Sequence, residues 1–95
     1  MGNMVPHWIN GEETHGTSGR DGPIYDPATG AEVRRVTYAN AQDVDLAVAS
    51  ARNAFPDWRD TPLAKRTQIM FSFRSLVDAA KDELAELISS EHGKT

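Results

Sequence analysis

The sequence predicts an arm of short β-strands over residues 1–39, followed by two or three amphipathic helices over residues 40–95. Asn10-Gly11 separates two short extended stretches, and this dipeptide is a strong signal for a two-residue hairpin turn. From Asn40 onward, apolar residues recur every three or four positions instead of every two, which matches the 3.6-residue period of a helix. The two halves of the chain are therefore expected to form different kinds of structure.

The hairpin strands are expected at residues 7–9 and 12–14, on either side of the Asn-Gly turn. Residues 15–22 contain three glycines and are expected to form a loop. Pro23 closes this loop, because its fixed φ and missing N–H suit an edge or a turn.

Two further extended segments are expected at residues 24–26 and 33–37. The turn between them is Pro27-Ala28-Thr29-Gly30, in which Pro27 presets φ and Gly30 is free to take a positive φ. These segments complete the predicted arm.

The first helix is expected to begin after Asn40, a suitable N-cap. Asp43 lies in the first turn, where a carboxylate meets the positive end of the helix dipole. Pro56 is expected to end this helix. Its apolar stripe consists of Val44, Ala47, Val48, Ala51 and Phe55.

Thr61-Pro62 repeats the start signal, a cap followed by a proline in the first turn. The helix that follows carries a stripe of Ile69, Phe73, Leu76, Val77 and Ala80. Apolar residues continue at helical spacing to Glu91, and periodicity alone leaves open whether residues 78–81 break the helix or continue it. Gly93 is a suitable C′ residue.

The composition indicates a piece of a larger domain. Leu, Ile, Val and Phe together number 18 of 95 residues, just under the ~20% below which a chain struggles to build a core. We therefore expect residues 1–39 and 40–95 to belong to one larger domain and to be poorly stable or self-associating alone.

Charge and cysteine content exclude several functions. A net charge of −4 leaves no basic surface for nucleic acid. The chain has no cysteine, which excludes disulfides, cysteine-ligated metals and a thiol nucleophile within it. It shows neither an apolar run long enough for a membrane span nor a secretory or lipidation signal, so we expect a soluble, cytoplasmic protein.

Two glycine patterns look like nucleotide-binding motifs but lack the required context. Gly93-Lys94-Thr95 resembles the end of a P-loop, yet position 88 is isoleucine and a helix precedes it. Gly16, Gly19 and Gly22 are spaced every third residue and lead to a proline, not to a helix, whereas a dinucleotide fingerprint opens a helix. We interpret the first as a helix stop and the second as a loop.

The remaining polar clusters do not form a site. His7, His15 and His92 lie at no metal-ligand spacing, and Glu12-Glu13 points to opposite faces of a strand. The cluster of Ile69, Met70, Phe71 and Phe73 is typical of core more than of a partner groove. From the residues alone, no catalytic, cofactor-binding or metal-ligating residue is predicted.

The chain contains an ordered series of short motifs: Asp26-Pro27-Ala28-Thr29-Gly30-Ala31-Glu32-Val33, Ala41-Gln42-Asp43-Val44-Asp45, Ala47-Val48-Ala49, Ala54-Phe55-Pro56-Asp57-Trp58, Arg66, Glu83-Leu84-Ala85-Glu86-Leu87-Ile88 and Glu91-His92-Gly93-Lys94. This series closely resembles the N-terminal portion of the aldehyde dehydrogenase superfamily, from about Trp8 to Thr95. The resemblance implies an α/β, aldehyde dehydrogenase-like fold for the full protein. Asp26 replaces the Asn that commonly precedes this turn, and both residues serve turns.

Three segments make the resemblance more specific: the arm His7-Trp8-Ile9 with Gly16-Thr17-Ser18-Gly19-Arg20, the run Phe71-Ser72-Phe73-Arg74 and the ending Glu91-His92-Gly93-Lys94. Within the superfamily, they are most similar to the methylmalonate-semialdehyde dehydrogenases, which acylate CoA. The resemblance implies NAD-dependent oxidation of methylmalonate or malonate semialdehyde with CoA, giving acyl-CoA and CO₂. The alternatives are a hydrolytic NAD(P)-dependent aldehyde or succinate-semialdehyde dehydrogenase, and a non-catalytic helical interaction module.

The resemblance also places the chemistry outside this chain. In the family a Cys attacks the aldehyde, hydride passes to NAD and the thioester is released to water or CoA, with no metal. The helices at 42–55 and 62–91 resemble those that pack on the cofactor-binding domain, so their implied role is support. The 95-residue chain is expected to be inactive, and the full-length protein is expected to be a homo-oligomer that acts on a small semialdehyde and binds neither nucleic acid nor membrane.

Overall fold

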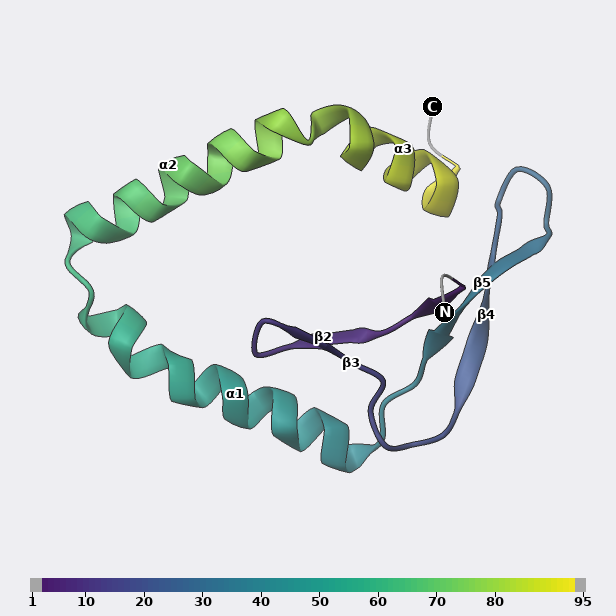
Figure 1. The fold of residues 1–95 in the computed structure, drawn as a ribbon, viewed down its shortest axis with the longest axis horizontal. Helices are drawn as coiled ribbons and strands as arrows, with labels where there is room; N and C mark the ends of the chain where they lie inside the picture. Colours follow the sequence, from purple (N-terminus) through teal and green to yellow (C-terminus); the bar gives the residue numbers. More distant parts are fainter. Residues whose placement is uncertain (1–2, 94–95) are drawn as a thin grey trace.

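The computed structural model describes residues 3–93, which form a strand-rich arm followed by three helices. Helix α1 and the pair α2–α3 curve around as two sides of an open ring, with the strands between their ends (Figure 1). The elements are β1 (Met4–Val5), β2 (His7–Ile9), β3 (Glu12–Thr14), β4 (Asp21–Tyr25), β5 (Glu32–Thr37), α1 (Ala41–Asp60), α2 (Leu63–Ala79) and α3 (Lys81–His92).

The predicted hairpin is confirmed. Strands β2 and β3 pair antiparallel, with Trp8 opposite Glu13. Asn10 and Gly11 both have positive φ, at 55° and 76°, as a type I′ turn requires. The local dipeptide therefore sets the register of these two strands.

A three-stranded sheet in the order β1-β5-β4 forms the other half of the arm. Strand β1 runs parallel to β5, a pairing that the sequence analysis did not predict. Strand β4 begins at Asp21, so the expectation that residues 21–22 belong to the loop is wrong. Pro23 is accommodated because β4 is an edge strand, where a missing N–H need not break a ladder.

The turn between β4 and β5 is confirmed, and it is held by its own residues. The Asp26 carboxylate accepts the N–H of Ala28 at 2.9 Å, and the Asp26 carbonyl accepts the N–H of Gly30 at 2.7 Å. Gly30 has φ 76°. Asp26 thus makes the side-chain contact that Asn or Asp provides at such turns.

Helix α1 begins as predicted but ends later. Asn40 is the N-cap, and it forms a capping box with Asp43. Pro56 lies inside the helix, which continues to Asp60, so the prediction that Pro56 ends it is wrong. Proline removes one amide donor but its φ is compatible with a helix, and the last turn is held by the Thr61 hydroxyl, which donates to the Asp57 carbonyl at 2.6 Å.

The hydrogen bond from the Thr61 hydroxyl to the Asp57 carbonyl also makes the prediction that Thr61 is an N-cap wrong. Thr61 is the C-cap of α1, and α2 begins at Leu63 with no side-chain cap. The open question about residues 78–81 is resolved as a break, because Ala80, at φ −97° and ψ 12°, separates α2 from α3. Gly93 ends α3 in the left-handed conformation, as predicted.

Asp43 joins the arm to the helices. Its carboxylate accepts the N–H and hydroxyl of Thr17, both at 3.0 Å, and the N–H of Asn40 at 3.0 Å. The side chain of Asn40 in turn donates to the Thr17 hydroxyl at 2.8 Å. Gly16 lies against this carboxylate with φ 69°, and a Cβ there would meet Asp43 Oδ2. We call Gly16, Thr17, Asn40 and Asp43 the Asp43 junction.

The described residues form no apolar core. Asp43 is 3% exposed, whereas no hydrophobic side chain among residues 3–93 is buried. The accessible surface is 7767 Å², roughly 2,400 Å² more than a compact domain of this mass would have. The radius of gyration is 17.0 Å, against about 12 Å for a compact chain of this length. The helical stripes are therefore exposed among the described residues.

The end of α3 returns to the arm. Arg34 of β5 donates to Glu91 of α3 at 2.9 Å, and Gly93 lies beside Pro27 of the β4–β5 turn. Arg35 pairs with Asp21 at 2.7 Å and with Glu32 at 3.0 Å. Both arginines are engaged in ion pairs on the surface.

Replacing the N-cap, Asn40→Ala, is expected to weaken the first turn of α1 by about 0.5–2 kcal/mol, because the Asp43 N–H loses its acceptor. Hydrogen-exchange protection of the Asp43 amide measures this loss. Asn53→Ala, in the exposed middle of the same helix, is the control and is expected to be neutral or stabilising. Equal effects of the two substitutions would contradict the capping role.

The Asp43 junction is expected to weaken in acid. Hydrogen bonds from the Asn40 N–H, then from Thr17, together with nearby His7, hold the pKa of the Asp43 carboxyl below its usual value, while burial opposes the shift. Because the folded pKa is lowered, this stabilisation is present above the unfolded pKa, about 4, and is lost as pH falls through the folded pKa.

Hydrogen-exchange protection of the Thr17 amide, measured from neutral pH down to acid, checks this dependence. Asp43→Asn is expected to lower the protection at neutral pH and to remove most of its fall in acid. The control is Asp45→Asn, an exposed carboxylate on the same helix. A wild-type profile that is flat below pH 4 would refute the prediction.

Candidate functional site

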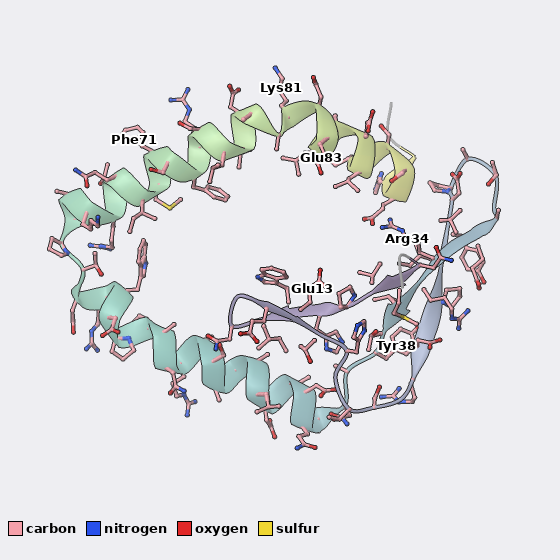
Figure 2. All side chains as sticks on the ribbon, in the orientation of Figure 1. Glu13, Arg34, Tyr38, Phe71, Lys81 and Glu83 are labelled. Carbon is pink, nitrogen blue, oxygen red and sulfur yellow. The ribbon has the colours of Figure 1, made fainter. Side chains whose placement is uncertain are left out.

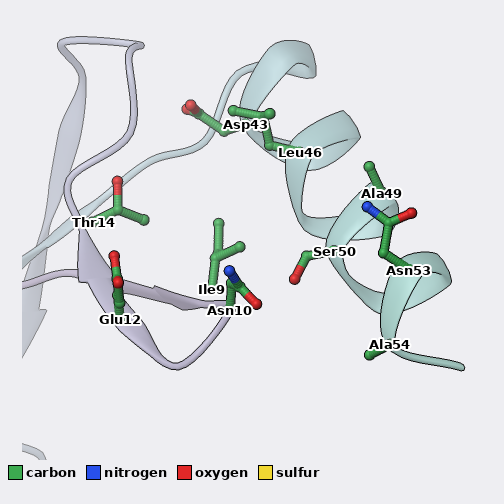
Figure 3. A pocket seen from close by; sticks show the side chains of 10 residues that line it. All are labelled: Ile9, Asn10, Glu12, Thr14, Asp43, Leu46, Ala49, Ser50, Asn53 and Ala54. Atoms are coloured by element: carbon green, nitrogen blue, oxygen red, sulfur yellow. The ribbon is translucent and has the colours of Figure 1, made fainter. Parts of the chain in front are cut away.

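A groove lies between the β2–β3 hairpin and α1 (Figure 3). It encloses about 610 Å³ and opens widely to solvent. Its walls are Ile9, Asn10, Glu12, Thr14, Asp43, Leu46, Ala49, Ser50, Asn53 and Ala54. The hairpin forms one wall, and the face of α1 that carries Ala49, Ser50 and Ala54 forms the other.

The groove does not contain the groups that catalysis requires. The Asp43 carboxylate already accepts hydrogen bonds from Thr17 and Asn40, so it is committed to the junction. Glu12 is exposed on the hairpin, and Ser50 has no histidine or lysine among the lining residues to activate it. A nucleophile needs such a base within hydrogen-bond reach. The groove is a recess between two elements, not an active site.

The histidines do not converge. His7 Nε2 lies 2.9 Å from the Thr37 carbonyl, which fixes the hairpin to β5. His15 lies in the loop after β3, and His92 is the last residue of α3. No group of three potential metal ligands occurs among residues 3–93. His7 therefore has a structural contact that sequence reasoning missed, because its partner is 30 residues away.

The glycine-rich loop is not a dinucleotide cradle. Gly16 and Gly19 each have φ 69°, and the loop leads into β4, whereas a dinucleotide site needs the N-terminus of a helix. Gly22 is needed for packing, since a Cβ there would overlap the hydroxyl of Tyr38, the residue labelled in Figure 2. The N-terminus of α1 is already capped by Asn40 and Asp43. This loop and the N-terminus of α1 thus do not fit NAD.

The other sequence candidates are dispersed over the surface. Glu12 and Glu13 are both exposed on β3. Phe71 and Phe73 are 61% and 57% exposed on α2. Gly93 is a helix stop, whereas Lys94 and Thr95 lie outside the described residues. In the described part of the chain, no helix is both long and apolar enough to cross a membrane.

Sequence comparison identifies the family. The model of the aldehyde dehydrogenase family matches residues 14–95. The malonate-semialdehyde dehydrogenase of Pseudomonas aeruginosa is 40% identical over 89 residues, and malonate-semialdehyde dehydrogenase 1 of Oceanobacillus iheyensis is 39% identical over 91. These alignments cover 94% and 96% of this chain but 18% and 19% of the relatives.

Solved structures agree with this comparison. A protein assigned as a methylmalonate-semialdehyde dehydrogenase from Sinorhizobium meliloti, complexed with NAD, matches with a TM-score of 0.89 and 38% identity. Methylmalonate-semialdehyde dehydrogenase from Oceanimonas doudoroffii matches with a TM-score of 0.89 and 36% identity. The two structural alignments cover 94% and 95% of this chain and 18% of each of the solved chains.

The chain thus spans about a fifth of the length of these relatives. Its strands and three helices have the fold of the corresponding segment of solved aldehyde dehydrogenases, as the sequence predicted. The family model covers most of the chain, and the curated relatives are well above 30% identical to it. The chain belongs to the aldehyde dehydrogenase family.

Proposed function

We propose that this chain is the N-terminal part of an NAD-dependent, CoA-acylating dehydrogenase of methylmalonate or malonate semialdehyde. The full protein converts semialdehyde, NAD⁺ and CoA to acyl-CoA, CO₂ and NADH. The agreement of two independent comparisons carries this proposal: relatives by sequence are named malonate-semialdehyde dehydrogenases, and structural neighbours are named for methylmalonate semialdehyde. One neighbour is a complex with NAD.

The residues of this chain support the reaction without taking part in it. A thiol nucleophile is needed to form the acyl-enzyme, and the chain contains no cysteine. Its contribution is to position α1, α2 and α3 against the cofactor-binding domain. The Asp43 junction serves this role by fixing where α1 leaves the arm.

The same proposal covers the assembly and location of the protein. We propose a soluble, cytoplasmic homo-oligomer that acts on a small semialdehyde without a metal. The net charge of −4 supports the absence of nucleic acid and membrane as partners, because it leaves no basic surface on these 95 residues. NAD and CoA bind outside the 95 residues, because the glycine-rich loop leads into β4 and the N-terminus of α1 is capped.

The full-length protein is expected to form NADH from methylmalonate or malonate semialdehyde at a useful rate only when CoA is present. A CoA-acylating enzyme keeps its thioester from water until a thiol arrives, and the pocket around the nucleophile sets that discrimination. Steady-state assays with and without CoA measure it. NADH formation that is equally fast with and without CoA would instead identify a hydrolytic dehydrogenase. Succinate semialdehyde is the comparison substrate.

The 95-residue chain alone is expected to have no dehydrogenase activity, because it has no thiol nucleophile. The assay is the purified chain with NAD, CoA and semialdehyde, compared with buffer. Turnover above buffer would refute this expectation. A chain that remains monomeric and melts cooperatively would favour a self-contained helical module over a part of an enzyme.

A further inference from the structure

The turn of the β2–β3 hairpin holds two groups that can react with each other. Asn10 and Gly11 are both exposed at its tip. Within the part of the chain that the structure describes, neither the Asn10 side-chain amide nor the Gly11 N–H makes a hydrogen bond. A Cβ added at Gly11 would meet nothing within 4 Å. The electrophile and the nucleophile are therefore both free, and no distant part of the chain crowds them.

An asparagine that precedes glycine is prone to cyclise, and this reaction needs only water. The Gly11 nitrogen attacks Cγ of Asn10, the Cγ–Nδ2 bond breaks, and ammonia leaves with the proton of the Gly11 amide. Water then opens the resulting succinimide at either carbonyl. One product is aspartate in an ordinary chain, and the other is isoaspartate, in which the chain runs through the β-carbon. Glycine favours the attack because it has no side chain to obstruct it.

The structure separates this dipeptide from a second one that looks similar in the sequence. Asp21-Gly22 could form the same ring by losing water instead of ammonia. The Asp21 carboxylate, however, pairs with Arg35 at 2.7 Å. Gly22 is buried within β4, opposite Val36. The tertiary structure thus leaves the Asn10 turn free and holds the Asp21 pair in the sheet.

The hairpin is also suited to the rotation that the attack requires. Strands β2 and β3 have three residues each and pair with each other in a two-stranded sheet. Such a hairpin is at best marginally stable by itself, and exposed loops open at little cost in free energy. His7 ties the base of the hairpin to the Thr37 carbonyl, which leaves the tip able to move.

We propose that Asn10 is a site of spontaneous deamidation through a succinimide, and that the isoaspartate product unpairs the hairpin. The aspartate product keeps the turn, because Asp-Gly also forms type I′ turns. Isoaspartate adds a backbone carbon to the two-residue turn, and loop length fixes hairpin register, so the pairing of Trp8 with Glu13 is lost. Both products add a negative charge to the groove that Glu12 lines.

The test compares two asparagines of the full-length protein. Asn53 is exposed on the opposite wall of the same groove (Figure 3), but it lies in α1 and precedes Ala54. The protein is incubated at neutral pH for several weeks, and its peptides are quantified by mass spectrometry. Deamidation makes a peptide heavier by the difference between water and ammonia. We expect Asn10 to react at least ~10-fold faster than Asn53, which corresponds to about 1.4 kcal/mol in the barrier.

Hydrogen exchange of residues 7–14 tests the effect on the hairpin. The aspartate and isoaspartate peptides separate in chromatography, so both are measured in one aged sample. We expect faster exchange in the isoaspartate peptide and unchanged exchange in the aspartate peptide. Asn10→Gly is the control, because a Gly-Gly turn is compatible with this hairpin and has no amide to cyclise. Its exchange is expected not to change with age.

Equal rates at Asn10 and Asn53 would overturn the proposal. A product that is aspartate alone would also overturn it, because direct hydrolysis of the side chain gives no isoaspartate. If a synthetic peptide of residues 7–14 deamidates while the full-length protein does not, the turn is held or covered in the complete protein and the assignment of the site is wrong. Exchange that is equal in the two product peptides would overturn the unpairing of the hairpin.

Discussion

The carboxylate of Asp43 is a buried charge, whereas no apolar side chain among residues 3–93 is buried, and the rest of the structure depends on how that charge is satisfied. Its donors come from both sides of the boundary between strands and helices, Thr17 from the loop and Asn40 from the helix cap. A buried charge must be hydrogen-bonded. The first turn of α1 is consequently tied to the loop that precedes β4.

Local hydrogen bonds and ion pairs therefore maintain the shape that apolar burial maintains in a complete domain. The contact between Arg34 and Glu91 brings α3 back to the arm, but it is exposed, and such pairs contribute about 0–1 kcal/mol. Burial of the helical stripes would contribute far more, at about 25 cal/mol per Å². The arm and the junction specify geometry, whereas the exposed helical stripes of the described residues contribute little of that stabilisation.

This division explains why the chain carries the family's pattern without its chemistry. The carboxylate at the junction is engaged by hydrogen bonds, His7 contacts the Thr37 carbonyl, and the glycine-rich loop leads into a strand. Each polar group that looks available in the sequence has a structural partner or lies alone on the surface.

The sequence by itself determined the features held within a few residues: the Asn10-Gly11 hairpin, the Asp26–Gly30 turn and the Asn40 cap. It also identified the family, since ordered local motifs suffice for that. The tertiary structure alone decided the parallel pairing of β1 with β5 and the bond from Thr17 to Asp43, 26 residues apart. It also showed that Pro56 does not end α1. Pairings between distant segments depend on how the chain closes on itself, and local propensity and periodicity contain no information about that closure.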